Sequence, residues 1–201
     1  RDSSKVSTLI DRIDNGITSN ITKVIIRRDL KALLNQFAQY ELCFGNKFNI
    51  NSAGYNIKST GFTINGFNDI AYITDVPNKN ASGGLDGSNM GTLSVVTKNN
   101  KGEQRVIVKD AGVVDYKKGE VILNTINITS TVSTNNIIEV QAFPESNDVV
   151  GLRDLYLELS VSKSTINMVR DVIASGDEIS GTQFVRDYYT SSYSNGKLIR
   201  E

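Results

Sequence analysis

The sequence predicts an α+β protein that is mainly antiparallel β, with a short N-terminal helix, a long hairpin, a β-rich sandwich-like domain and an extended C-terminal tail. Three observations predict this class. Apolar residues follow helical spacing close to the N-terminus. Short runs rich in Val, Ile and Thr then succeed one another along most of the chain. Segments rich in Asn, Gly and Ser separate these runs, as turns separate the strands of an antiparallel sheet.

The first segment, "DSSKVSTLIDRIDNG", predicts an amphipathic helix over residues 4–14. Its polar start offers residues that can cap a helix N-terminus, and Asn15-Gly16 is a typical stop signal. Four apolar residues between these signals share one helix face: Val6, Leu9, Ile10 and Ile13.

The second segment, residues 17–44, predicts a long antiparallel hairpin. The stretch from Ile17 to Arg28 is rich in Ile, Val and Thr and contains neither Gly nor Pro, which is typical of a strand. Asn35-Gln36 can form the turn, and apolar and polar residues alternate after it. The stretch "LKALLNQFA" also fits a helix, so two alternatives remain for residues 30–38.

The third segment, residues 45–91, is rich in Asn, Gly and Ser. "KSTGFTI" and "DIAYITDV" predict short strands joined by "NGFN". The stretch from Asn78 to Gly91 has no apolar face and is expected to be a mobile loop. It lacks the Lys-Ser/Thr pair of a phosphate loop, and Asp86 is its single acid, too few for a calcium loop.

Residues 92–162 predict six further strands at short spacing, which is the pattern of an antiparallel β-rich domain. They are "TLSVVTK", "QRVIVKDAG", "GVVDY", "EVILNTINI", "NIIEVQAFP" and "DLYLELSVS". The stretch "STINMVRDVIAS" that follows fits a strand or a short helix.

The stretch "DYKKGE" raises the question of a catalytic carboxylate pair. Lys117, Lys118 and Gly119 predict a turn between two strands, with glycine at the position that tolerates positive φ. Asp115 and Glu120 then flank a solvated turn and face the lysines. A hydrolytic pair instead needs two acids in a cleft, about 5 to 9 Å apart. We therefore interpret the stretch as a charged hairpin turn.

Composition excludes several other functions. The chain has 22 basic and 22 acidic residues, so it lacks the basic excess of a nucleic-acid or anionic-membrane binder. It contains no histidine, which removes His-dependent triads and His-ligated zinc. Cys43 alternates with apolar neighbours and is expected to be a small buried hydrophobe. We predict no catalytic, cofactor-binding or metal-binding residues, no cofactor and no enzyme activity.

The C-terminal tail, residues 176–201, has no clear period but carries many apolar groups. Such a segment suits docking onto another surface, with packing onto its own domain as the alternative. The candidate interface residues are Phe184, Tyr188, Tyr189, Tyr193, Leu198 and Ile199. Because the chain begins with Arg1 rather than Met, we also expect it to be a piece of a longer polypeptide.

Taken in order, several stretches resemble the C-terminal region of the large baseplate wedge protein of T-even-type contractile-tailed phages, with marine and cyanobacterial phage versions the most similar. They are "SSKVSTLIDRIDNGITSNITKVIIRRD", "IKSTGFTINGF", "GVVDYKKGEVIL", "VQAFPESNDVVGLRDLYLELSVSKSTINMVRD" and "IASGDEISGTQF". The resemblance covers nearly the full length.

The resemblance implies a structural virion protein of the tail baseplate, assembled in the host cytoplasm. It implies that copies of the chain join one another and other baseplate wedge proteins in a ring around the tail hub, and that the ring relays the change that triggers sheath contraction. Nucleic acid, membrane and small-molecule substrates are not expected partners. Residues 1–48 would end a baseplate J-like domain, followed by a β-rich domain at 49–175.

Two alternatives from other classes remain. A tail or fibre domain that recognises a receptor or glycan would need an exposed aromatic platform on a rigid sheet, and the chain has no Trp. A hydrolase would need two acids that converge in a pocket.

Overall fold

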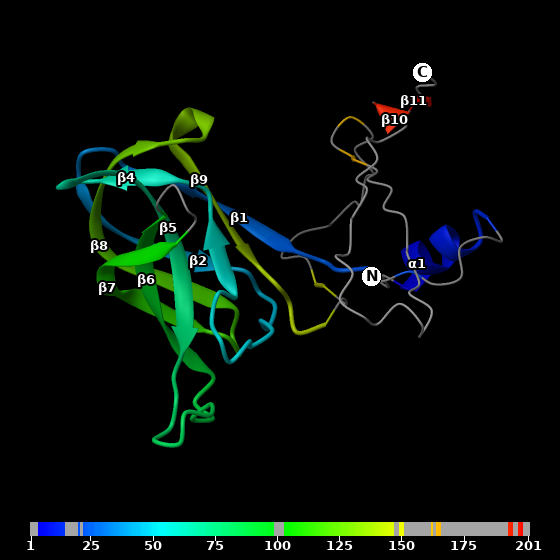
Figure 1. The fold of residues 1–201 in the computed structure, drawn as a ribbon, viewed down its shortest axis with the longest axis horizontal. Coiled ribbons are helices and arrows are strands. Elements are labelled where there is room, and N and C mark those ends of the chain that lie inside the picture. The colour runs from blue at the N-terminus through cyan, green and yellow to red at the C-terminus, as the bar shows by residue number, and fades with distance from the viewer. Residues whose placement is uncertain are drawn as a thin grey trace, which may run out of the picture. The chain divides into compact units, whose positions relative to one another are not determined.

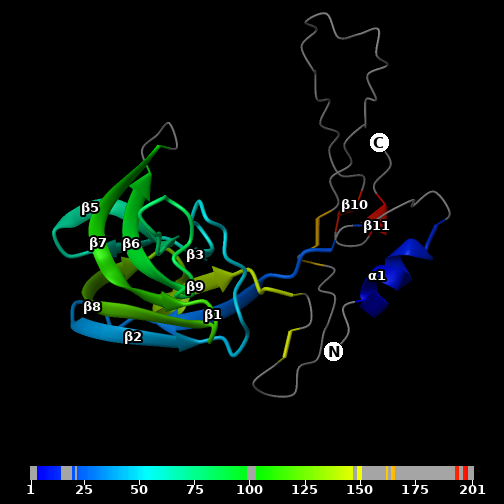
Figure 2. The same cartoon turned by 90° about the horizontal axis from the view of Figure 1, so that it is seen from below.

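The computed structural model describes residues 4–14, 20, 22–98, 103–146, 149–150, 162, 164–165, 193–194 and 197–198. The chain divides into two compact units, Arg1–Arg153 and Asp154–Glu201. The first unit contains one short helix and the strands β1 to β9, all in antiparallel pairs (Figures 1 and 2). The predicted class, mainly antiparallel β with a short N-terminal helix, is confirmed.

The larger sheet has the strand order β2-β8-β4-β5-β6-β7. Its strands are β2 (Phe37–Cys43), β4 (Phe62–Ile64), β5 (Phe67–Pro77), β6 (Met90–Lys98), β7 (Gln104–Asp115) and β8 (Glu120–Thr131). Strand β8 pairs with β7 through its first residues and with β4 through its last. The sheet therefore curls back on itself and becomes barrel-like (Figure 1).

A bulge in β8 explains how one strand serves both partners. The buried positions of β8 are Val121 and Leu123 in its first half, then Ile126 and Ile128 in its second. Two consecutive exposed residues, Asn124 and Thr125, lie between these pairs. On the partner strand β2, a single residue, Gln39, lies opposite these two residues. Such a bulge bends a strand and increases its twist, which lets β8 follow the curled sheet.

The smaller sheet has the order β1-β9-β3, with β1 at Ile26–Lys31, β9 at Ile137–Ala142 and β3 at Ile57–Ser59. A 3₁₀ turn, η1 (Thr134–Asn136), leads from β8 into β9. Strand β9 alternates strictly, with Ile138, Val140 and Ala142 buried. These residues belong to the same core as Val95, Val114 and Ile128 of the larger sheet. The two sheets thus share one hydrophobic core.

The predicted long hairpin does not form. The turn at Asn35-Gln36 is present, and Asn35 has a φ of +58°. However, β1 pairs with β9 in the smaller sheet, whereas β2 pairs with β8 in the larger one. Local pattern identifies a strand but not its partner, because pairing depends on the whole core. The helical alternative for residues 30–38 is also excluded, since strand and turn occupy them.

Other boundaries differ from the sequence pattern in smaller ways. Helix α1 spans Ser4–Asp11 and is shorter than predicted; Leu9 within it and Ile13 just after it are largely exposed. "QRVIVKDAG" and "GVVDY", predicted as two strands, form the single strand β7 with a register shift near Asp110, whose φ is +54°. The predicted strand at 154–162 and the ambiguous stretch at 164–175 lie outside the described residues, apart from 162 and 164–165.

The loop from Asn78 to Gly91 is an ordered extension of the β5–β6 hairpin. Asn80 organises its tip: its Oδ1 accepts the backbone N–H of Ser82 at 3.0 Å and of Gly84 at 3.1 Å. At the base, the Asn78 N–H donates to the Met90 carbonyl at 2.9 Å. The stretch is therefore a loop, as expected, and Asn side chains rather than apolar contacts fix its turns.

In the second unit the described residues form one element, a short antiparallel pair of β10 (Tyr193–Ser194) and β11 (Lys197–Leu198). The sequence analysis overlooked it, although Asn195-Gly196 between the two strands is a strong hairpin signal. Among the helices of the described residues, none is long and apolar enough to cross a membrane.

Candidate functional site

The β7–β8 turn has the form that the sequence predicts. Asp115 and Glu120 are paired in register at the ends of the two strands. Gly119 has a φ of +72°, and its N–H donates to the Asp115 carbonyl at 2.9 Å. A Cβ atom added to Gly119 would lie 2.0 Å from the Asn46 carbonyl oxygen. Both the positive φ and this close approach require glycine.

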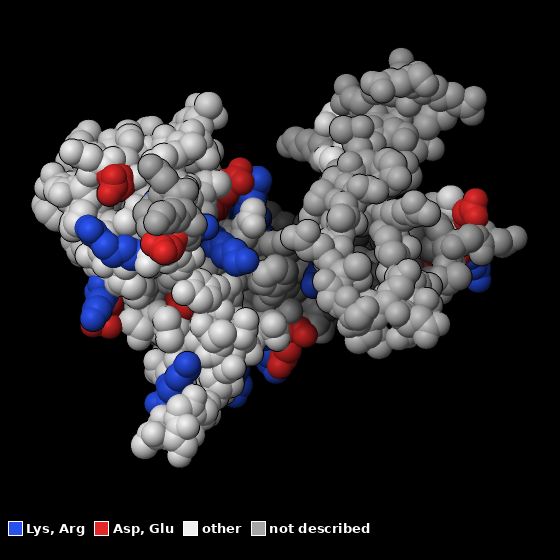
Figure 3. All heavy atoms as spheres, in the orientation of Figure 1, with Lys and Arg blue, Asp and Glu red and all other residues white. Residues whose placement is uncertain are grey.

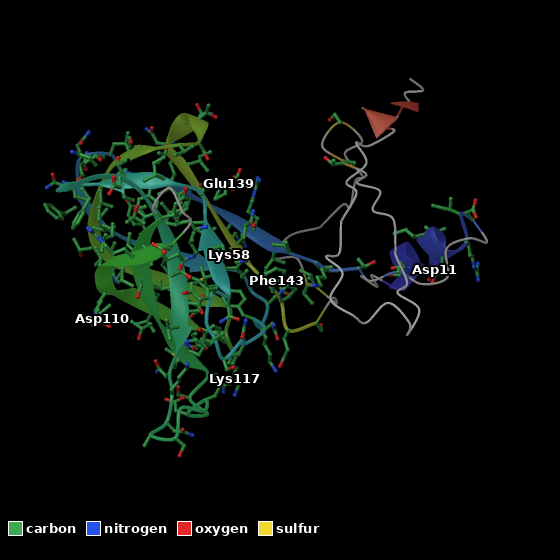
Figure 4. The ribbon with its side chains drawn as sticks, viewed as in Figure 1. Asp11, Lys58, Asp110, Lys117, Glu139 and Phe143 are labelled. Atoms are coloured by element: carbon green, nitrogen blue, oxygen red, sulfur yellow. The ribbon has the colours of Figure 1, made fainter. Side chains whose placement is uncertain are left out.

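The two acids of the turn share one lysine. The Lys118 Nζ atom lies 3.9 Å from Asp115 Oδ2 and 3.8 Å from Glu120 Oε2. The Lys118 backbone N–H also donates to Asp115 Oδ1 at 3.0 Å. The lysine side chain is 68% exposed, so both ion pairs are in contact with solvent. These contacts describe a charged surface turn, at the position labelled by Lys117 in Figure 4.

Tyr116, inside the same turn, points into the core and is 1% exposed. Its hydroxyl donates to Asp75 Oδ2 at 2.5 Å. Sequence analysis placed the whole turn in solvent and missed this residue. The signal was present, because Tyr116 continues the alternation of Val114 and therefore lies on the same inward face.

Asp75 is a fully buried acid at the centre of this contact. Its Oδ1 accepts the Ile57 N–H at 2.6 Å, and its Oδ2 accepts both the Tyr116 hydroxyl and the Asn56 amide, the latter at 2.8 Å. These three donors satisfy the hydrogen-bonding capacity of the carboxylate, which would be strongly unfavourable if it were buried without partners.

We call Asp75, Tyr116 and Asn56 the buried polar cluster. Asn56 extends it to the loop before β3, because its Oδ1 accepts the Asn51 N–H at 2.6 Å. The cluster thereby connects that loop to strand β5 and to the β7–β8 turn. The side chains of the cluster form hydrogen bonds with one another and with the backbone, an arrangement typical of a structural role.

Burial, followed by the hydrogen bond to Asp75 and the charge of Asp75, raises the pKa of Tyr116 well above its ordinary value of 10.0. The phenol is therefore held in its protonated, hydrogen-donating form. A tyrosine acting as a general base at neutral pH would need the opposite shift.

Cys43 is exposed on β2, so the expectation of a buried small hydrophobe is wrong. In β2, Ala38, Tyr40 and Leu42 lie inward, and Cys43 lies outward with Glu41. The signal was present in the sequence, because Cys43 shares the parity of Glu41, whereas Tyr40, Leu42 and Phe44 form the apolar face.

Ligand atoms of Glu41, Cys43 and Glu120 lie within 4.8 Å of one another on this outer face. Sequence analysis predicted no metal-binding residues and did not anticipate this grouping, which the β2–β8 register creates. Partial desolvation, the hydrogen bond to Glu41 and the charges of Glu41 and Glu120 raise the pKa of the Cys43 thiol. The thiol is therefore a poorer nucleophile at neutral pH than an isolated cysteine.

Strand β2 is an edge of the larger sheet. Along the described part of the chain, no strand pairs with its outer side. Phe37 at its start is 72% exposed, and Leu33 just before the turn is 52% exposed. A free backbone edge flanked by exposed apolar side chains is a site at which another strand or surface can add.

Charged groups of both signs are interspersed on the face of the molecule shown in Figure 3. Arg27, for example, lies 2.9 Å from Glu139 across the β1–β9 pair and 3.3 Å from Asp29 on its own strand. Such a mixed surface agrees with the net charge of zero.

The predicted interface residues of the tail are only partly described. Tyr193 and Leu198 face each other in register in the β10–β11 pair. Phe184, Tyr188, Tyr189 and Ile199 lie outside the described residues.

Comparison with protein-family models, with curated proteins and with solved structures found no match to this chain.

Proposed function

We propose that this chain is a structural component of a phage tail baseplate wedge. In this proposal a rigid, sandwich-like β body joins copies of itself and other wedge proteins in a ring around the tail hub. The ring relays the conformational change that triggers sheath contraction. The protein acts in the virion, after assembly in the host cytoplasm, and its role is mechanical rather than catalytic.

The observation that carries the proposal is the open edge of β2. Phe37 and Leu33 are both more than half exposed at the end of this strand. Edge strands of proteins that remain monomeric are usually protected by charge, proline or a covering segment. The outer edge of β2 begins at Phe37, which is 72% exposed, so the apolar start of this edge is accessible. An assembling protein can use such an end as an anchor, since a few apolar groups dominate interface energies.

The buried polar cluster is a second observation that supports a structural role. Asp75 and Tyr116 belong to residue types that often perform acid–base chemistry, yet both are buried and hydrogen-bonded to each other. The raised pKa of Tyr116 favours a permanent donor. These groups stiffen the body, and a stiff body is what a force-transmitting part of a ring requires.

The test measures the native mass of the full chain by light scattering, across a range of protein concentrations. We expect wild-type protein to form higher-mass species as concentration rises. Phe37→Ser should shift this association to at least about tenfold higher concentration, because anchors of this kind contribute about 2 kcal/mol or more.

Leu85→Ser is the matched control, because Leu85 is also an exposed apolar residue, at 41%, but lies in the β5–β6 loop. It should leave association unchanged. The proposal of assembly through β2 is contradicted if Phe37→Ser associates like wild type. The wedge assignment itself is contradicted if the chain stays monomeric at all concentrations and retains no baseplate proteins when purified from infected cells.

A further inference from the structure

A groove of about 430 Å³ lies where four parts of the first unit meet. Its walls come from the segment before β1, the loop between β2 and β3, strand β3 and the segment after β9. The residues that line it and bear on a ligand are Lys23, Asn49, Asn51, Tyr55, Lys58 and Phe143. Its volume lies within the range of about 300–1,000 Å³ that is usual for small-molecule sites.

Tyr55 is the exposed aromatic residue of this groove, with 48% of its surface accessible. Its φ is +63°, a left-handed conformation that is unusual for a bulky side chain. The conformation is held by its N–H, which donates to the Asp75 carbonyl at 3.0 Å. Gly54, with a φ of +86°, brings the chain so close that an added Cβ would lie 2.6 Å from the same oxygen.

This backbone conformation is unfavourable for a non-glycine residue and persists because the surroundings determine it. The consequence is that the Tyr55 ring stays at the surface. The residue that follows, Asn56, is held by Asp75 below the groove. The ring therefore stands on a rigid floor, which reduces the entropy lost when a ligand binds.

The charges that line the groove are both positive. Lys23 and Lys58 are exposed, and the lining includes no acid. The Lys58 Nζ atom lies 5.8 Å from the centre of the Phe143 ring, and the two residues are labelled beside each other in Figure 4. Asp75 is not one of the lining residues, and its two oxygens are hydrogen-bonded to three donors in the interior. The groove therefore favours an anionic ligand.

Amide side chains complete the lining. Asn49 and Asn51 are both exposed there, and each amide can donate and accept hydrogen bonds. Hydroxyl groups, which also donate and accept, are their natural partners. An aromatic face beside such amides matches a pyranose ring, which has an apolar C–H face and a rim of hydroxyls.

We propose that this groove binds an acidic saccharide, whose sugar ring packs on Tyr55 and whose carboxylate or sulfate group pairs with Lys23 and Lys58. An acidic peptide would satisfy the lysines but would offer no comparable face to Tyr55. This binding site goes beyond the wedge role and does not depend on it, because either result of the association experiment leaves the groove unchanged.

The experiment titrates the full chain with a sulfated heparin-derived disaccharide by calorimetry. Three other probes are titrated in parallel: maltose as a neutral disaccharide, tripolyphosphate as an anion without a sugar, and a hexaglutamate peptide. We expect the sulfated disaccharide to bind at least about tenfold more tightly than each of the other three, a difference of about 1.4 kcal/mol.

Two variants test the residues. Tyr55→Asn removes the ring but keeps a residue type that tolerates left-handed φ, and Lys58→Gln removes one charge. Each should weaken binding of the disaccharide by about tenfold or more. Lys109→Gln, an exposed lysine of β7 that does not line the groove, is the matched control and should bind like wild type.

The proposal is overturned if no probe binds at millimolar concentration, or if maltose, tripolyphosphate or hexaglutamate binds as tightly as the sulfated disaccharide. It is equally overturned if Tyr55→Asn binds like wild type. Should Tyr55→Asn fail to fold, Lys58→Gln combined with Lys23→Gln decides, because unchanged binding in that double variant would contradict the ionic pairing.

Discussion

At the scale of single residues, the hydrogen bond between Tyr116 and Asp75 is the contact with the clearest energetic consequence. Both residues are almost inaccessible to solvent. Removing one partner leaves the other buried with fewer hydrogen bonds than it needs. The cost of that loss is larger than the net contribution of a hydrogen bond at the surface.

We predict that Tyr116→Phe lowers the free energy of unfolding by about 1–3 kcal/mol, because one oxygen of Asp75 loses a donor while the aromatic ring is retained. Urea denaturation at pH 7 measures the change. Tyr72→Phe, a change of the same size at a half-buried residue of β5, is the control and should alter stability by less than about 0.5 kcal/mol. An equal effect of the two substitutions would contradict the role given to the Asp75 contact.

The same pair predicts a dependence on alkaline pH. The pKa of Tyr116 is raised in the folded protein, so above pH 10.0 the folded state keeps a proton that the unfolded state loses. The stability that Tyr116 contributes is therefore complete below pH 10.0 and falls as the pH rises further. The slope approaches about 1.4 kcal/mol per pH unit for one proton.

The difference in unfolding free energy between wild type and Tyr116→Phe should consequently narrow between pH 10 and pH 11. Denaturation curves recorded at intervals of pH measure it. Using the difference cancels the titration of the other tyrosines and of the lysines. A constant difference across this range would show that the Tyr116 pKa is not raised.

At the β7–β8 turn, substitution of Gly119 should affect stability far more than substitution of the two acids. Gly119→Ala should destabilise the protein by about 2 kcal/mol or more, because the added Cβ meets the Asn46 carbonyl at 2.0 Å and the φ is positive. Asp115→Asn and Glu120→Gln should each cost less than about 1 kcal/mol, since their ion pairs with Lys118 are solvent-exposed.

Thermal unfolding of the three variants measures this ranking. If Asp115→Asn or Glu120→Gln abolished an assayable activity without loss of folding, the interpretation of the stretch as a structural turn would be overturned.

At the scale of elements, the β5–β6 loop shows how polar side chains replace a core. The Asn80 Oδ1 atom accepts two backbone N–H groups, and its amide donates to the Leu85 carbonyl at 3.3 Å. Asp86 Oδ1 likewise accepts the N–H and the hydroxyl of Ser88, at 2.8 and 2.7 Å. All of these bonds are exposed to solvent, so the loop is expected to open more easily than the strands that it connects.

We predict that limited proteolysis cleaves within residues 78–91 before it cleaves the flanking strands. Asn80→Ala should accelerate that cleavage severalfold without changing the global unfolding free energy, because the bonds lost are local. Lys79→Ala, in the same loop, removes a side chain but none of these hydrogen bonds, and should be cleaved at the wild-type rate. Strong amide protection across the loop in the isolated chain would contradict the prediction.

At the scale of the whole molecule, the core determines which parts of the chain depend on one another. The buried cluster extends from Leu30 to Ala142 and includes strands from both sheets. Residues 154–201 form a separate unit. Among the described residues, every member of that core lies within the first unit, and loss of β1 or β2 would open it.

We predict that deleting residues 181–201 leaves the melting transition of the body within a few degrees of wild type but weakens assembly. The deleted segment contains Phe184, Tyr188, Tyr189 and four other apolar residues, and such anchors contribute about 2 kcal/mol or more each at an interface centre. Calorimetry and the native mass of the assembly measure the two effects. Unfolding of the body would show that the tail belongs to its core, and no change in mass would refute docking.

The sequence by itself determined the local features of this protein. The antiparallel β class, the N-terminal helix and the turn at Lys117–Gly119 each follow from a short pattern, and each is present. The reason is that alternation, capping residues and positive φ at glycine act over a few neighbouring residues. Asp75 could also have been found, because it shares the inward alternation of Ala71 and Ile73 in β5.

Only the tertiary structure decided which strands pair and which faces are buried. The turn at Asn35 is local, but the separation of β1 and β2 into different sheets depends on β8 and β9, whose paired residues lie between 77 (Cys43 to Glu120) and 116 (Ile26 to Ala142) positions further along the chain. The contact of Tyr116 with Asp75 joins residues 41 positions apart. The strand pairing and the buried faces are those that minimise the free energy of the whole core at once, and no short stretch contains that information.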